Sequence, residues 1–176
     1  MEGDKMERLW SPWRMEYLTR TEHAGECVFC RKLNADCEHD RDNLIIHRAT
    51  HAAILMNLYP YNNGHLMVIP YRHVPTTECL DLETLSEIMA LAHVSMAMLR
   101  RVLRPDGFNM GINLGKAAGA GIHEHVHMHI VPRWNGDTNF LQVCAETRVI
   151  PELLPDTYDK LSAALRAYLD ERGTGA

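Results

Sequence analysis

A run of histidines at alternate positions restricts this chain more than any other sequence feature. His125, His127 and His129 alternate with Val126, Met128 and Ile130. Alternation at period two predicts a β-strand with one apolar face against a core and the other face presenting imidazoles. Since a strand rises about 3.3 Å per residue, His123 and His129 should lie roughly 20 Å apart, too far to serve one small group together. We therefore expect neighbouring histidines to have different roles.

Several kinds of site could use such a strand. Imidazoles in a row are costly to hold unless they are solvated, bound to metal or paired with an anion. A strand that merely faces solvent leaves the adjoining glycine-rich loop unexplained. Metal sites of the cupin or metallo-β-lactamase type need a carboxylate ligand as well, and the first carboxylate after His129 is Asp137. A purely metal-centred enzyme is thus open but unsupported.

Covalent catalysis at phosphorus agrees better with the residues. A neutral imidazole is a good nucleophile toward an activated phosphate, and a second acceptor can then cleave the phosphoramidate. The small residues at 115–121 allow a phosphate to approach the backbone closely and can offer N–H groups to its oxygens. The loop and the strand together favour this chemistry.

Composition sets the class of protein. The chain of 176 residues is 46% hydrophobic and 23% charged, which excludes global disorder and suits one domain. Its net charge of −5 argues against a nucleic-acid-binding surface or a polybasic membrane surface. No apolar run approaches the length of a membrane span, and no signal peptide is visible. The odd number of cysteines suits a reducing compartment, so we expect a cytoplasmic protein.

Hydrophobic periodicity predicts the fold class. Short strands are expected at 43–47, 52–57, 65–70, 108–114, 125–131 and 140–150. Apolar residues at three- and four-residue steps over 85–103 predict a long amphipathic helix, with Asp81 as its cap. A C-terminal helix is expected at 151–172, and residues 19–42 are interpreted as a loop or a metal knuckle. The prediction is an α+β fold, an antiparallel sheet with one long helix packed on it.

The same residues resemble a known family. The alternating histidines match the signature of the histidine-triad (HIT) superfamily of nucleotide hydrolases and transferases, and residues 64–70 resemble its Gly-His strand. The segment 132–140 and the tryptophan-rich start are similar to the bacterial diadenosine tetraphosphate phosphorylase-like branch. The resemblance implies a single HIT domain over 1–176, with a family core at 27–134, an N-terminal aromatic segment at 1–26 and a C-terminal helix at 151–172.

The resemblance also implies roles for individual residues. His127 would be the nucleophile that accepts a nucleoside monophosphate, His129 would contact the α-phosphate and place the leaving group, and His65 would hydrogen-bond in the same pocket. The implied nucleotide-binding residues are Asn57 at the ribose, Asn113 at the phosphate, Gly119 and Gly121 in the loop, His129, and Trp134, for which packing in the core or a dimer is an equal alternative. The expected substrates are diadenosine polyphosphates or related adenine nucleotides, and the expected assembly is a homodimer.

The chain departs from the family in the loop before the triad. Many relatives carry a serine there whose hydroxyl contacts phosphate, where this chain has Ala120, Gly121 and Ile122. The acceptor of the adenylyl group, water or phosphate, therefore stays open, as does a nucleotide-binding sensor or interaction protein with little catalysis. A zinc-binding structural protein is a third possibility. His123 and Glu124 form an unusual polar pair, and Glu124 could pair with Arg133.

Cys27 and Cys30 have the spacing of a metal-binding pair, but tetrahedral zinc needs two further ligands. In zinc-bearing members of the superfamily, one further ligand follows the Gly-His strand and the other is the first histidine of the triad. The resemblance thus implies a structural zinc held by Cys27, Cys30, His73 and His125. The segment 37–39 is a rival source of ligands.

Overall fold

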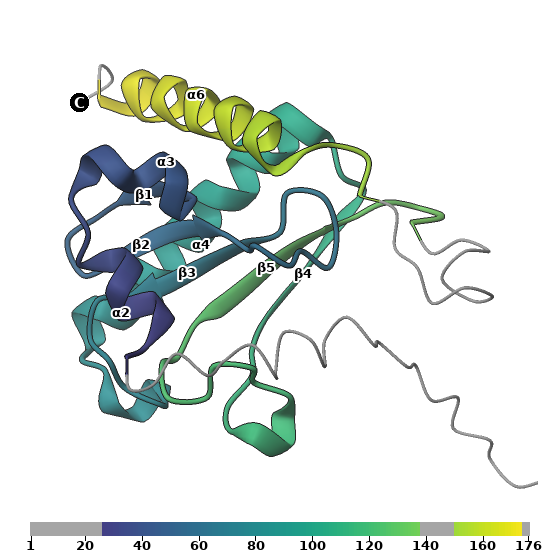
Figure 1. Cartoon of the computed structure of the whole chain (residues 1–176). Helices are drawn as coiled ribbons and strands as arrows, with labels where there is room; N and C mark the ends of the chain where they lie inside the picture. The colour runs from purple at the N-terminus through teal and green to yellow at the C-terminus, as the bar shows by residue number, and fades with distance from the viewer. Residues whose placement is uncertain (1–25, 138–149, 174–176) are drawn as a thin grey trace, which may run out of the picture.

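The structure is a computed structural model that describes residues 26–137 and 150–173. In this part of the chain, five strands form one antiparallel sheet in the order β1-β2-β3-β5-β4 (Figure 1). The strands are β1 (Ile45–Arg48), β2 (Ala52–Met56), β3 (Leu66–Pro70), β4 (Gly107–Ile112) and β5 (Met128–Arg133). The α-helices are α2 (Val28–Leu33), α3 (Asp40–Asn43), α4 (Leu82–Leu103) and α6 (Leu154–Gly173). The predicted α+β fold class is confirmed.

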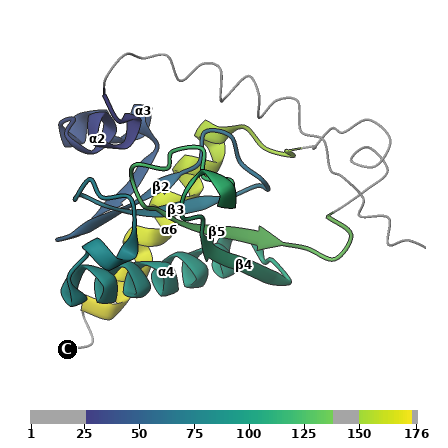
Figure 2. The ribbon, with the colours of Figure 1, turned by 90° about the horizontal axis from the view of Figure 1, so that it is seen from below.

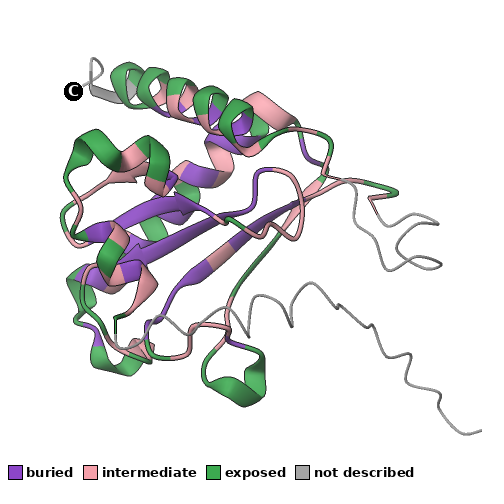
Figure 3. Ribbon diagram, viewed as in Figure 1, coloured by how far each residue is buried: buried purple, intermediate pink, exposed green. Residues whose placement is uncertain are grey.

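Helices cover both faces of the sheet. Figure 2 shows α4 on one side of the sheet, and α2 and α3 on the other, and α6 shares one hydrophobic core with α4. Because strand residues point alternately to the two faces, Ile54 and Met56 of β2 pack with α4, whereas Ala53 and Leu55 pack with α2. Figure 3 shows that β2 and β3 are buried along their length, as expected for central strands covered twice.

Helix α4 begins and ends where the sequence predicts. The side chain of Asp81 accepts a hydrogen bond from the backbone N–H of Thr84 over 2.8 Å, which caps the N-terminus. Arg104, with φ of 49°, ends the helix in the left-handed conformation, directly before Pro105. By length and hydropathy alone α4 could span a membrane, but several of its apolar residues, among them Ile88, Leu91 and Leu99, pack in the core against the sheet.

Gly64 brings the start of β3 against the end of α4. Its φ is +72°, a conformation that side chains rarely adopt. A Cβ at this position would lie 2.5 Å from Cδ1 of Leu103 and 3.0 Å from Cδ2 of Leu99. The glycine before His65 is thus required by a close approach of backbone to helix.

The strand of histidines is shorter than predicted. It was expected at 125–131, but β5 begins only at Met128. The reason is a change of partner, since Met128 pairs with Val68 of β3, whereas the N–H of Val126 donates to the carbonyl of Val74, beyond the end of β3, over 2.7 Å. The segment before Met128 therefore leaves the sheet.

In the described part of 19–42 the interpretation as a loop is wrong, whereas the alternative of a metal knuckle agrees with the clustering of Cys27 and Cys30 with two histidines. Residues 28–33 form α2, 37–39 form a 3-10 helix, and α3 follows directly and replaces the start of the strand predicted at 43–47. These helices are too short to show a helical period in the sequence. The predicted C-terminal helix is present as α6, whereas the strand predicted at 140–150 and the N-terminal aromatic segment lie outside the described residues, apart from the last residue of each.

Candidate active site

A cavity of about 640 Å³ lies between α2, the loop after β2 and the glycine-rich loop before β5. This volume falls in the range of about 300–1,000 Å³ that is usual for small-molecule sites. Five of the predicted catalytic and nucleotide-binding residues line it, namely Asn57, Gly119, Gly121, His127 and His129, and so does Cys27 of the predicted metal site. Its apolar wall includes Val28, Phe29, Leu55 and Leu58, and Tyr61 and Lys32 also line it.

His127 is held as a neutral imidazole with a defined tautomer. Its Nδ1 lies 2.9 Å from the carbonyl oxygen of His125, and because a carbonyl can only accept, Nδ1 carries the proton. The second ring nitrogen, Nε2, therefore keeps its lone pair. Burial lowers the pKa of His127 below its ordinary value, which favours the neutral form further. This is the state that a nucleophilic histidine needs.

His65 sets the tautomer of His129, here by donating a hydrogen bond to it. The backbone N–H of Tyr61 donates to Nδ1 of His65 over 3.1 Å, so His65 carries its proton on Nε2. That Nε2 lies 3.0 Å from Nδ1 of His129 and donates to it. A neutral His129 therefore carries its own proton on Nε2, as a donor. The Tyr61 ring stacks on His65 with centroids 4.8 Å apart and supports the pair from the side.

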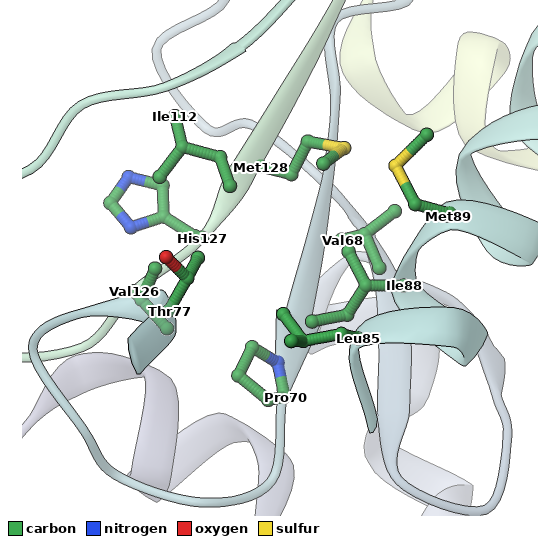
Figure 4. Close-up of a pocket in the computed structure, with 10 residues that line it drawn as sticks. All are labelled: Val68, Pro70, Thr77, Leu85, Ile88, Met89, Ile112, Val126, His127 and Met128. Atoms are coloured by element: carbon green, nitrogen blue, oxygen red, sulfur yellow. The ribbon is translucent and has the colours of Figure 1, made fainter. Parts of the chain in front are cut away.

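His127 and Met128 point to opposite sides of the chain. Figure 4 shows the imidazole of His127 on one side of β5 and Met128 on the other, facing Met89 of α4 across a small cavity of about 100 Å³. The lining of this second cavity is mostly apolar. The alternation therefore does what the sequence indicates, since His127 and His129 line the larger cavity while Met128 faces the helix.

Four potential metal ligands converge beside this site. The ligand atoms of Cys27, Cys30, His73 and His125 all lie within 4.8 Å of one another. Cys27 Sγ lies 3.4 Å, and Cys30 Sγ 3.5 Å, from His125 Nδ1; Cys30 Sγ lies 3.3 Å from His73 Nδ1, and the two Nδ1 atoms are 3.3 Å apart. Bond lengths to tetrahedral zinc would place sulfur and nitrogen ligands about 3.5 Å apart, and two nitrogens about 3.4 Å apart. The four residues fit such an ion.

The surroundings of these residues also suit a metal. His125 is fully buried, and its Nε2 lies 2.8 Å from the carbonyl oxygen of Pro70, so the proton is on Nε2 and Nδ1 is left to bind an ion. Burial, followed by the neighbouring Cys27, raises the pKa of the Cys30 thiol to about 11. A bound ion would displace that proton.

Two of the predicted nucleotide-binding residues lie away from the larger cavity. Asn113 and Trp134 lie in the described part of the chain but are not among the residues that line the larger cavity. Trp134 follows β5, and its backbone N–H donates to Asp137 over 3.2 Å. Arg133 forms an ion pair with Asp137 and not with Glu124. Oε1 of Glu124 lies 3.9 Å from Nε2 of His123.

Phe29 and Tyr61 are site residues that sequence reasoning missed. Both line the larger cavity and contact histidine rings, Phe29 at His127 and Tyr61 at His65 and His129. Its position between Cys27 and Cys30 could have indicated that Phe29 lies next to the predicted metal site. Tyr61 lies in a turn-rich segment before the Gly-His pair, where no periodicity marks it.

Comparisons with known proteins agree with this geometry. The family model described as the HIT domain matches residues 38–136. The chain is 42% identical over 166 residues to AP-4-A phosphorylase of Mycobacterium tuberculosis, covering 88% of this chain and 82% of that protein. It is 33% identical over 121 residues to bis(5'-adenosyl)-triphosphatase of Dictyostelium discoideum, covering 66% and 79%.

A solved structure is also similar. The Zn-bound histidine triad family protein from Mycobacterium smegmatis superposes with a TM-score of 0.65 at 30% identity, over 84% of this chain and 97% of that one. The family model covers more than half of the chain, and the mycobacterial relative is matched over most of its length. This chain therefore belongs to the HIT domain family.

Proposed function

We propose that this protein cleaves diadenosine polyphosphates or related adenylated nucleotides at the α-phosphate, through a covalent intermediate on His127. The observation that carries the proposal is the tautomer of His127, whose Nδ1–H is held by the carbonyl of His125 while Nε2 keeps its lone pair. The enzyme names of two relatives support the substrate class, namely AP-4-A phosphorylase and bis(5'-adenosyl)-triphosphatase.

The first step transfers the nucleoside monophosphate to the protein. His127 Nε2 attacks the α-phosphorus, an N–P bond forms, and the P–O bond to the remaining polyphosphate breaks. The N–H on Nε2 of His129 donates a hydrogen bond to the leaving oxygen and stabilises the charge that develops there, so that the polyphosphate leaves as an anion and His129 keeps its proton. Backbone N–H groups of the loop at Gly119 and Gly121 would bind the phosphate oxygens, and Asn57 would hold the ribose.

The second step frees His127. An acceptor attacks the same phosphorus, the N–P bond breaks, and Nε2 regains its lone pair. We propose inorganic phosphate as the acceptor, supported by the name of the 42% identical relative, a phosphorylase. Diadenosine tetraphosphate would then give ATP in the first step and ADP in the second.

Product analysis tests the proposal. Diadenosine tetraphosphate is incubated with the protein, with and without inorganic phosphate, and the products are separated by ion exchange. We expect ATP and ADP to form, and only when phosphate is present. ATP and AMP without phosphate would make water the acceptor, and no product in either reaction would favour the nucleotide-binding sensor.

We further propose that Cys27, Cys30, His73 and His125 hold a structural zinc ion. The mixed sulfur and nitrogen donor set and its tetrahedral spacing support this, as does the zinc-bound structural neighbour. The ion would supply rigidity and no chemical step.

A cytoplasmic homodimer is the assembly that we propose. β4 lies at the edge of the sheet and carries Met110, which is 43% exposed. An edge strand with an exposed apolar side chain can pair with a second copy. Light scattering after size-exclusion chromatography should give twice the mass of one chain, whereas the monomer mass would contradict the proposal.

A further inference from the structure

Phe29 lies between the metal cluster and the proposed nucleophile. It stands in the chain between Cys27 and Cys30, in the first turn of α2, and is only 5% exposed. Its ring makes edge contacts with His125, centroids 5.6 Å apart, and with His127, centroids 5.0 Å apart. One side chain therefore contacts a proposed metal ligand and the proposed nucleophile at the same time.

A second connection runs through the backbone. His125 offers its ring to the metal cluster and its carbonyl oxygen to Nδ1–H of His127. Any shift of His125 would thus move the acceptor that fixes the tautomer of His127. The ring of Phe29 and the carbonyl of His125 hold the same imidazole from two directions.

Helix α2 depends on anchors at its two ends. It has six residues, too few to be stable by itself, and it forms one wall of the nucleotide cavity. At its C-terminal end, Arg48 donates to the carbonyls of Leu33 over 2.6 Å and Ala35 over 3.0 Å. At its N-terminal end, Cys27 and Cys30 belong to the metal cluster. An ion would therefore fix the end of the wall that carries Phe29.

We propose that Phe29 is a positioning residue, through which an ion bound by the four metal-site residues orients His127 and the cavity wall. Metal binding and nucleotide binding then reinforce each other. This inference rests on the proposed function, because it needs a nucleotide in the larger cavity. Thermodynamic linkage requires the effect to be reciprocal, so that each ligand raises the affinity for the other by the same factor.

The test measures both affinities on the full chain. Zinc affinity is determined by competition with a chromogenic chelator, with and without saturating AMP, and AMP affinity by calorimetry on zinc-loaded and zinc-depleted protein. We expect AMP to raise zinc affinity about tenfold, and zinc to raise AMP affinity by the same factor, within the usual coupling range of about 5- to 150-fold.

Variants at Phe29 separate positioning from packing. In Phe29→Leu, zinc should still bind, but the coupling factor should fall to less than half of its wild-type value, since the ring contacts are gone while the contact through the carbonyl of His125 remains. Phe29→Tyr keeps the ring and should keep the coupling. The matched control is Leu33→Ala, which removes a buried side chain of the same helix that does not line the cavity, and should lower stability with the coupling unchanged.

Each contrary outcome has a distinct meaning. If AMP binds with the same affinity in the presence and absence of zinc, the inference is overturned while the proposed function stands. Full coupling in Phe29→Leu, or equal loss in Leu33→Ala, would also overturn the role of Phe29. If AMP does not bind to either form, the inference and the proposed function both fail.

Discussion

Nε2 of His65 donates a hydrogen bond to Nδ1 of His129 over 3.0 Å, which joins the start of β3 to β5. His65 itself accepts from the backbone N–H of Tyr61, so the protons of both rings follow from one peptide group. A donor on His129 is thereby aimed by the fold, without any carboxylate in the relay. In the proposed reaction, this donor hydrogen-bonds the leaving oxygen and stabilises its developing charge.

Replacing His65 tests that relay. In His65→Phe the ring cannot donate to His129, so we expect kcat to fall by about 10²-fold, the lower end of what loss of one positioned hydrogen-bond donor costs. KM should change little because His65 does not line the cavity. His65→Gln carries an amide N–H₂ donor and should recover part of the loss. Steady-state kinetics check this, and equal losses in the two variants would contradict the relay.

The acidic limb of the pH profile tests the state of His127. Its attack requires a neutral ring, and burial lowers its pKa below the ordinary value of 6.5. We therefore expect kcat/KM to stay level as pH falls to 6.5 and to decline only below it. Since the unfolded chain takes up this proton at higher pH than the folded one, the same shift should lower stability as pH falls below 6.5. A decline with its midpoint above pH 6.5 would contradict the assignment.

Gly64 offers a test of the packing that positions His65. In Gly64→Ala the Cβ would overlap Leu103 at a φ of +72°, and we expect a loss of about 2–4 kcal/mol in the free energy of unfolding, measured in urea. Gly136→Ala is the matched control because its φ is +78° but no atom lies within 4 Å of the added Cβ. It should cost only about 1–2 kcal/mol for the backbone conformation. Equal losses would show that the contact with α4 is unimportant.

Metal analysis tests the proposed zinc site. The purified protein should contain about one zinc per chain, the content of a single tetrahedral site. Cys27→Ser should lower the zinc content well below that value and lower Tm, because a ligand is lost. Cys37→Ser is the control and also tests the rival ligands at 37–39, since Cys37 is an exposed free cysteine outside the cluster. Loss of zinc in Cys37→Ser alone would assign the metal to the rival segment.

Periodic features of the sequence predicted the parts of the fold that depend on them. Strands β2 and β3 are short continuous apolar runs, and helix α4 has apolar residues at three- and four-residue steps after its capping residue, Asp81, so their type could be predicted directly. Helix α2 could not, because six residues show no period. The start of β5 depends on the hydrogen bond from Val126 to Val74, a contact between distant segments that no local pattern encodes.

In the candidate site, the residues whose chemistry marks them could be predicted from the sequence, and the aromatic residues that pack beside them could not. The triad, the Gly-His pair and the cysteine spacing carry chemistry in their residue types, and the structure brings these residues together. Phe29 and Tyr61 were missed because an aromatic ring in a loop or short helix has no chemical signature. Asn113 and Trp134 were expected from resemblance to a motif, and the structure leaves them outside the cavity lining.

The central claim is that His127 carries the nucleoside monophosphate. The most direct measurement mixes the protein with diadenosine tetraphosphate labelled at the α-phosphate, in the absence of inorganic phosphate, and quenches in base, where phosphoramidates survive. We expect labelled protein from the wild type and from His93→Ala, an exposed histidine of α4 that does not line the cavity, and none from His127→Ala, which should still bind AMP. Label retained on His127→Ala, or turnover by that variant, would contradict the claim.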